Sequence, residues 1–243
     1  MFWPRRRDKG NGLADRGSVV VAGTGPKLGL ALARQFSADG YRVLMLARRA
    51  EPLEALAASV WPDVFGRACD LTEAGAVDAA FAHAEAALGP VACAVFNASA
   101  RRPGGILEVS AAEFEQGWRV GCLAGFHVGQ AAARNMVPRG AGTILFTGAT
   151  ASLKGNAKST AFAAQKFGLR AVAQSMARDL GPQGIHVARM SSSTAGSGMR
   201  GRPPRRSSTL STLPAPMPGC TRSRAPPGRR KSTCGRWARS SRR

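Results

Sequence analysis

Residues 18–34 read Ser-Val-Val-Val-Ala-Gly-Thr-Gly-Pro-Lys-Leu-Gly-Leu-Ala-Leu-Ala-Arg, and the rest of the chain is organised around this stretch. Its β-branched start, Val19 to Val21, is typical of a buried strand in a parallel sheet. A turn with three glycines follows, at Gly23, Gly25 and Gly29. Beyond the turn, apolar residues recur every four positions and predict a helix whose apolar face holds Leu28, Leu32 and Phe36.

A strand, a glycine turn and a helix N-terminus together make an anion site, because free backbone N–H groups and the helix dipole both point at the turn. The pyrophosphate of a dinucleotide would bind there. The spacing is G-x-G-x-x-x-G rather than the common G-x-G-x-x-G, and an ordinary strand-to-helix turn can carry the same glycines. The nucleotide interpretation therefore depends on the strand and the helix that flank the turn.

Up to about residue 189, short apolar strands alternate with helices. We expect further strands at 41–47, 64–68, 91–96, 143–147 and 185–189, and helices at 51–60, 73–88, 111–137 and 160–180. This alternation predicts an α/β fold, a Rossmann-type doubly wound parallel sheet of six strands with helices on both faces.

Ligands of such sheets bind at the carboxyl ends of the strands, near the point where strand order reverses. Polar residues directly follow four of the predicted strands, at Arg48, Asp70, Asn97 and Thr147 to Thr150. We expect them at one edge of the sheet.

Charge divides the chain into three parts. Residues 1–17 form a basic leader, residues 18–189 the dinucleotide-binding domain, and residues 190–243 a tail. The tail carries 13 Lys and Arg and no acid, which is more than half of the net charge of +21. It is rich in Arg, Ser, Pro and Gly and has no Ile, Val, Phe or Tyr, a composition that predicts disorder.

Two interpretations of the tail stay open. Arg200-Gly-Arg-Pro203 resembles an AT-hook, an arm that lays arginines in the minor groove of DNA. In so biased a segment a four-residue match arises readily by chance, so we do not expect nucleic acid as a partner. The composition also changes inside a predicted strand rather than between elements, as a shifted reading frame in a GC-rich gene would cause.

The five cysteines are scattered and include no C-x-x-C pair. This pattern argues against a disulfide framework or a metal site and favours a reducing, cytoplasmic location. No apolar run approaches the roughly 18 residues that a membrane-spanning helix needs, so we expect no membrane partner.

From Ser18 to about Arg189 the chain resembles the short-chain dehydrogenase/reductase family. Five pieces carry the resemblance, in the family's order and spacing: the glycine turn at 22–29, Cys69-Asp-Leu-Thr72, Asn97-Ala-Ser-Ala100, Thr147-Gly-Ala-Thr150, and Phe162 four residues before Lys166.

The resemblance implies a bound nicotinamide cofactor. Gly23 and Gly29 match family glycines around Gly25, whereas Lys27 stands at the family's middle glycine, where its side chain would either crowd the pyrophosphate or pair with a phosphate. Arg48 follows the second strand without an acidic neighbour, as in the NADP-preferring relatives, since a guanidinium suits a 2′-phosphate. Asp70 matches the adenine-contacting aspartate, and Asn97 matches a sheet-supporting asparagine. A solvated loop charge is the alternative for Arg48.

The family's catalytic residues are mostly replaced. A Tyr protonates the carbonyl in the family, and here Phe162 stands at its position. The family's Ser falls at Ala149, beside Thr150 as a stand-in, and its relay Asn falls at Gly121. Lys166 alone is retained, in a position that implies both lowering the pKa of the missing Tyr and holding the nicotinamide ribose.

The resulting prediction is an NADP(H)-binding oxidoreductase for carbonyl reduction or alcohol oxidation, with weak or lost activity. Two alternatives are a non-catalytic NADP(H)-binding sensor or scaffold, and nucleic-acid binding through the tail. Ser152 and His127 are further candidates for a substitute proton donor. The resemblance also implies a small carbonyl or alcohol substrate, and a homodimer paired through the two long helices.

Overall fold

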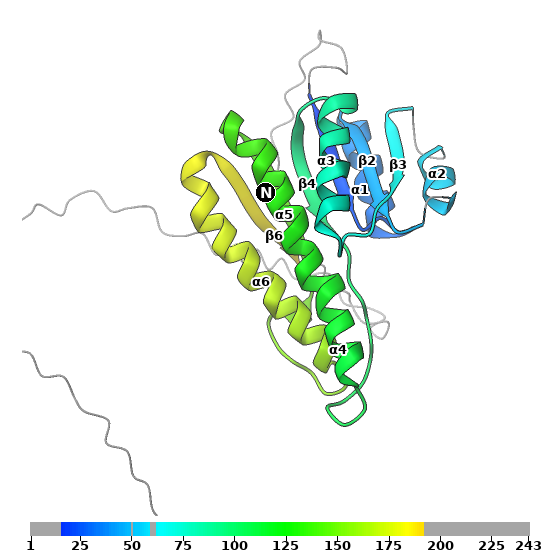
Figure 1. Ribbon diagram of the computed structural model, residues 1–243, viewed down its shortest axis with the longest axis vertical. Coiled ribbons are helices and arrows are strands. Elements are labelled where there is room, and N and C mark those ends of the chain that lie inside the picture. Colours follow the sequence, from blue (N-terminus) through cyan, green and yellow to red (C-terminus); the bar gives the residue numbers. More distant parts are fainter. Residues whose placement is uncertain (1–15, 50, 59–61, 192–243) are drawn as a thin grey trace, which may run out of the picture. The chain divides into compact units, whose positions relative to one another are not determined.

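The computed structural model describes residues 16–49, 51–58 and 62–191, and within them the chain forms one sheet with helices on both faces (Figure 1). The strands are β1 (Ser18–Ala22), β2 (Arg42–Ala47), β3 (Val64–Ala68), β4 (Val91–Phe96), β5 (Gly142–Gly148) and β6 (Ile185–Ser191). The α-helices are α1 (Leu28–Ala38), α2 (Glu51–Ala58), α3 (Ala74–Leu88), α4 (Ala111–Trp118), α5 (Ala124–Met136) and α6 (Thr160–Leu180). Most of the predicted leader and tail lies outside the described residues.

All six strands are parallel and lie in the order β3-β2-β1-β4-β5-β6. The Rossmann-type fold predicted from the sequence is confirmed. Strand order reverses between β1 and β4, so the carboxyl ends of these two strands mark the expected ligand crevice.

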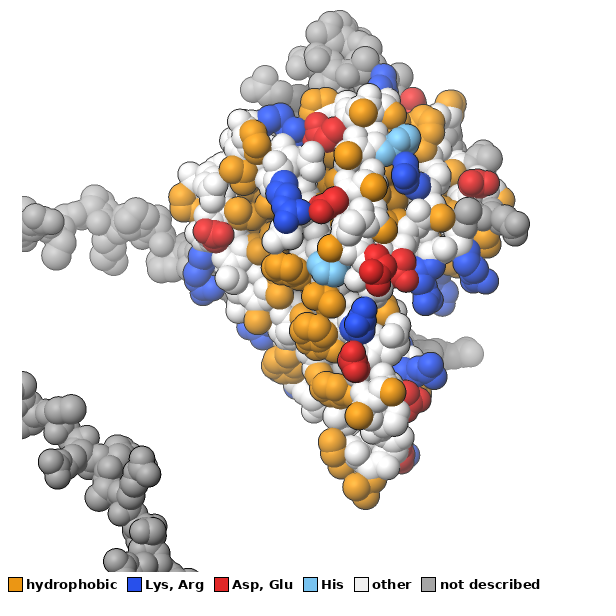
Figure 2. Space-filling model, viewed as in Figure 1, with side chains coloured by type: hydrophobic (Ala, Val, Ile, Leu, Met, Phe, Trp, Pro, Cys, Tyr) orange, Lys and Arg blue, Asp and Glu red, His pale blue; other side chains and the backbone are white. Residues whose placement is uncertain are grey.

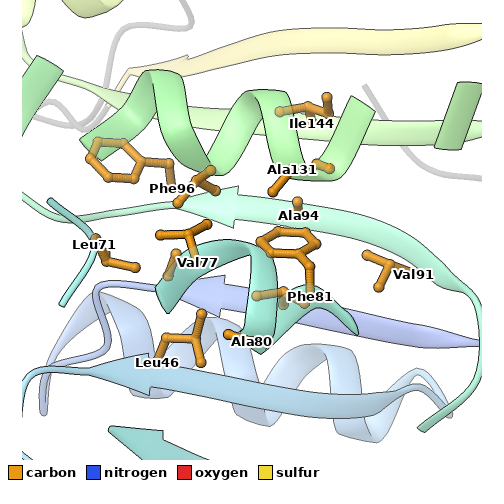
Figure 3. Packing of buried hydrophobic residues seen from close by; sticks show 14 of the residues in the cluster. Leu46, Leu71, Val77, Ala80, Phe81, Val91, Ala94, Phe96, Ala131 and Ile144 are labelled. Atoms are coloured by element: carbon orange, nitrogen blue, oxygen red, sulfur yellow. The ribbon is translucent and has the colours of Figure 1, made fainter. Parts of the chain in front are cut away.

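Alternate residues of each strand face opposite layers, because side chains of a strand alternate across the sheet. Val19 and Val21 of β1 pack in the layer with α1 and α2. Val20 and Ala22 pack in the layer with α3, α5 and α6. Figure 3 shows this second layer, where Phe81 of α3 meets side chains from β4 and α5. The strands β1, β2 and β4 are therefore apolar on both faces and read as continuous apolar runs.

The packing of α1 differs from the prediction. Its buried residues are Gly29, Ala33 and Ser37, whereas Leu28 is 40% exposed and Leu32 and Phe36 lie on the flank of the contact. The small residues let the helix axis approach the sheet closely, and the larger side chains fill the space on either side. The predicted spacing of four residues is present in α1, but the buried positions lie one residue later than the predicted ones.

The chain is helical along the predicted region 111–137, with a π-helical turn inside it. α4 begins at a capping box, in which Ser110 and Glu113 each bind the other's backbone N–H group. A π-helical turn, η2 (Arg119–Leu123), then separates α4 from α5. Turns of this kind insert an extra residue into a helix and often occur at functional sites.

None of the helices in the described residues is both long and apolar enough to cross a membrane.

Candidate functional site

The glycine turn between β1 and α1 is fixed by its neighbours. The N–H groups of Gly23 and Thr24 both donate to the Leu46 carbonyl at the end of β2, each at 2.9 Å. Gly23 has φ +91°, and a Cβ there would lie 2.7 Å from the Ala98 Cα. A left-handed residue pressed against backbone has to be glycine.

The other two glycines of the turn, Gly29 and Gly25, differ in what surrounds them. A Cβ on Gly29 would lie 2.8 Å from the Thr24 Cα, so this glycine lets the helix start close to the turn. A Cβ on Gly25 would meet nothing within 4 Å. Gly25 therefore faces open space in front of the first N–H groups of α1, where a phosphate would be expected.

Asn97 joins the end of β4 to the turn. Its Nδ2 donates to the Gly23 carbonyl at 3.0 Å, and its backbone N–H donates to the Ala22 carbonyl at 2.7 Å. These two bonds hold the carboxyl ends of β1 and β4 together at the point of strand reversal.

A cavity of about 820 Å³ opens at this edge, spanning the carboxyl ends of β1 to β4. It is large enough for a sizeable organic ligand. Its lining includes all of the predicted cofactor residues except Lys166, namely Gly23, Gly25, Lys27, Gly29, Arg48, Asp70 and Asn97. Arg49 also lines it, and sequence reasoning gave this residue no role although it directly follows Arg48.

Three cations and one carboxylate line the cavity. Lys27, Arg48 and Arg49 are exposed at its rim. Asp70 accepts from the Thr72 N–H at 2.9 Å and from the Thr72 hydroxyl at 2.8 Å. These hydrogen bonds, led by the backbone one, lower the pKa of Asp70, and Arg48 adds to the effect. Asp70 is therefore an ionised acceptor held in place by its own turn.

The predicted catalytic residues lie beyond this cavity, around the end of β5. Lys166 of α6 is buried, and its Nζ donates to the Thr147 carbonyl at 3.0 Å. Burial lowers the pKa of Lys166 to about 8. Phe162, one turn earlier on α6, is half-buried and brings no polar atom to this place.

The candidate substitute donors lie in η4 and α5. Thr150 is exposed at the start of a short 3-10 turn, η4 (Thr150–Ser152). Ser152 is fully buried, and its Oγ accepts from the Ala149 N–H at 3.2 Å. His127 of α5 lies with its Nδ1 3.3 Å from the Leu71 carbonyl, on the α3 side of the helix. The described hydrogen bonds of Lys166 Nζ include the Thr147 carbonyl, and none joins it to Thr150, Ser152 or His127.

Sequence reasoning missed Gln165. Its side chain is fully buried between α6, the loop after β4 and the π-helical turn. The available signal was a second polar residue, directly before Lys166, in a stretch of α6 that otherwise turns small and apolar side chains inward. Within the described residues, no group of His, Cys, Asp and Glu could hold a metal ion.

Comparison with known proteins agrees with this geometry. A family model described as short chain dehydrogenase matches residues 18–205. The chain is 32% identical over 163 residues to 3-oxoacyl-[acyl-carrier-protein] reductase MabA of Mycobacterium tuberculosis, an alignment that covers 67% of this chain and 63% of that protein. The chain therefore spans somewhat less than two thirds of this relative's length.

Two solved structures are similar. A short-chain dehydrogenase from Rhodopseudomonas palustris has 40% sequence identity and a TM-score of 0.69, over 72% of this chain and 84% of that one. A variant of actinorhodin polyketide ketoreductase, solved with NADPH, has 24% identity and a TM-score of 0.70, over 74% of this chain and 70% of that one. The second likeness concerns the fold alone.

Proposed function

Because the chain belongs to the short-chain dehydrogenase family, we propose that it binds NADP(H) in the cavity at the carboxyl ends of β1 to β4. The observation that carries the proposal is the combination of a glycine turn with open space at Gly25 and three cations at the same rim. The cavity chemistry fits the cofactor, with an ionised Asp70 for the adenosine and N–H groups of α1 for the pyrophosphate.

The preference for NADP(H) over NAD(H) follows from Arg48. A guanidinium binds a phosphate with charge-assisted and often bidentate hydrogen bonds, whereas an acidic residue would be needed to accept from the ribose hydroxyls of NAD. Arg49 and Lys27 add positive charge to the same rim.

The chemistry that such a cofactor supplies when bound is transfer of a hydride to or from a small carbonyl or alcohol substrate. Lys166 would hold the nicotinamide ribose. Phe162 has no proton to give to the carbonyl oxygen, and general acid catalysis typically contributes about 10²–10⁴-fold. We therefore propose that carbonyl reduction or alcohol oxidation is weak or lost, and the same observation favours an NADP(H)-binding sensor or scaffold as the second candidate.

The test is a titration of the full chain with NADPH and, separately, with NADH. We expect NADPH to bind more tightly. Equal affinities would contradict the cofactor choice, and no binding of either would contradict the proposed function itself.

We also propose that two copies pair through α4, α5 and α6. Large apolar side chains are about 40% exposed along these helices at Phe114, Trp118, Phe126 and Phe167, and Figure 2 shows hydrophobic side chains gathered over α4 and α5. A monomeric mass by light scattering, unchanged by Phe126→Glu, would contradict this.

We also propose a cytoplasmic location, because the three described cysteines are free and buried. Recovery of the protein from the extracellular fraction of expressing cells, with its cysteines joined in disulfides, would contradict this location.

A further inference from the structure

Gln165 is a buried amide with a set of hydrogen bonds that reach across the fold. Its Nε2 donates to the Ala100 carbonyl at 2.7 Å, and its Oε1 accepts from the Ala100 N–H at 3.3 Å. Both polar groups of one backbone residue are thus bound by one side chain. The Gln165 side chain is fully buried, whereas Ala100 is half-buried, so the two bonds are partly shielded from water.

The space for this amide comes from Gly121. A Cβ on Gly121 would overlap the Gln165 Oε1, and it would also lie 2.9 Å from the Gln165 Cγ. Gly121 is in the π-helical turn η2, the only π-helical segment in the described residues. The irregular turn and the missing side chain therefore coincide at the point where Gln165 enters.

Ala100 ends a segment that belongs to the cavity. Asn97, Ala98 and Ser99 line the cavity directly, and Asn97 is bonded to the glycine turn. The same loop is tied a second time to the segment before α6, where the Gly104 N–H donates to the Lys158 carbonyl at 2.9 Å. The loop after β4 is thus held at Asn97, at Ala100 and at Gly104.

Gln165 lies beside the residues at the other end of the expected dinucleotide. Lys166 follows it directly, and Phe162 precedes it on α6. A dinucleotide that crosses from β1 to β4 must pass the loop that Gln165 holds before it reaches the end of β5. β4 lies between β1 and β5 in the sheet, so Ala100 and the loop that Gln165 holds stand on the side of the cavity toward Lys166 and the end of β5.

We propose that Gln165 is a positioning residue that clamps the loop after β4 against α6, and that it pre-forms the nicotinamide half of the site. The proposal rests on the proposed NADP(H) function. Without the clamp, the loop has to be ordered when the cofactor binds, and that cost lowers affinity. The adenosine half, which depends on the glycine turn and the rim cations, does not bear this cost.

The test compares two ligands on the full chain, NADPH and adenosine 2′,5′-bisphosphate, which holds only the adenosine half. Gln165→Met keeps the length of the side chain and removes both bonds to Ala100. We expect it to weaken NADPH about fivefold or more, the equivalent of one ordinary hydrogen bond, and to leave the bisphosphate unchanged. If Gln165 contributes to folding stability alone, Gln165→Met lowers the midpoint of thermal unfolding but does not change the affinities for the two ligands differently.

Two glycines of the same helical region provide a matched pair of variants. Gly121→Ala places a Cβ on the amide and should reproduce the pattern of Gln165→Met. Gly117→Ala places its Cβ 3.5 Å from the Gln165 Nε2, an ordinary contact, and should change neither affinity. In a Gln165→Ala background, where the amide is gone, adding Gly121→Ala should cost nothing further.

The outcomes separate the inference from the function beneath it. Equal weakening of both ligands, or no weakening of NADPH in folded Gln165→Met, overturns the clamp while the proposed function stands. Failure of the parent chain to bind either ligand overturns the proposed function, and the clamp with it.

Discussion

The two halves of the proposed site differ in the side chains that they hold. At the ends of β1, β2 and β4, the glycine turn, Asp70 and Asn97 are in place, fixed by hydrogen bonds and lining one cavity. Around the end of β5, Lys166 is buried and bonded to the Thr147 carbonyl, and Phe162, one turn earlier on α6, has no polar side-chain atom. In the proposed function, binding a dinucleotide and moving a proton thus depend on separate groups of residues.

The largest expected effect concerns the half of the proposed site around the end of β5. Phe162→Tyr should raise the rate of NADPH oxidation with carbonyl substrates by about 10²-fold or more, because it returns a general acid one helical turn from Lys166. NADPH affinity should stay nearly constant, because the added hydroxyl acts on proton transfer in the transition state and not on cofactor binding. Steady-state rates with a panel of small ketones and 3-oxoacyl thioesters provide the measurement.

Phe167→Tyr is the control for this variant, because Phe167 is 42% exposed on the same helix. An equal rise in rate for both variants would show that the added hydroxyl does not act at the site. Rapid turnover by the parent chain, unaffected by Lys166→Ala, would show that the chemistry occurs elsewhere.

A second prediction concerns the energetic cost of keeping Lys166. Its pKa of about 8 in the folded chain lies below the usual value of 10.5, so the folded chain binds fewer protons than the unfolded chain between these two values. Stability should therefore be lowest below pH 8 and rise toward pH 10.5. Lys166→Met should remove this rise, which amounts to about 3 kcal/mol at most.

Urea unfolding of the two proteins across this pH range measures the difference. The advantage of Lys166→Met over the parent should shrink as the pH rises. Lys154→Met, at an exposed lysine, should give the parent's slope. If the difference in unfolding free energy between Lys166→Met and the parent does not change with pH, then the buried charge of Lys166 does not destabilise the fold.

The smallest expected effect lies in the retained half. Arg48→Ala should erase most of the preference for NADPH over NADH, a change of about 10–100-fold in the ratio of their dissociation constants. Arg34→Ala, on the outer side of α1, is the control and should keep the ratio. If Arg48→Ala weakens NADPH and NADH to the same extent, Arg48 contributes general charge and no specificity.

Much of the fold was predictable because its signals are local. The β-branched start of β1 and the apolar runs of β2 and β4 each fit one strand, and α6 begins and ends where its apolar period and Gly181 indicated. The cavity residues follow strands directly, so the parallel arrangement alone gathers them.

What escaped prediction depends on contacts between distant segments. The residue types of 111–137 suit an α-helix with or without a π-helical turn. The sequence pattern therefore did not show where the turn would lie. The fit of Gln165 into the space beside Gly121 joins two helices that no local pattern relates. The predicted leader and tail mostly lie outside the described residues, so the interpretations of 190–243 stay predictions.

The most direct test of the difference between the two halves is a single-turnover measurement on the parent chain. NADPH is bound first, as followed by its fluorescence, and an excess of a 3-oxoacyl thioester is then added while the absorbance of the reduced nicotinamide is recorded. We predict that NADPH binds and then remains reduced. Fast oxidation of the bound NADPH would contradict the account, because it would show that the site moves a proton without a tyrosine.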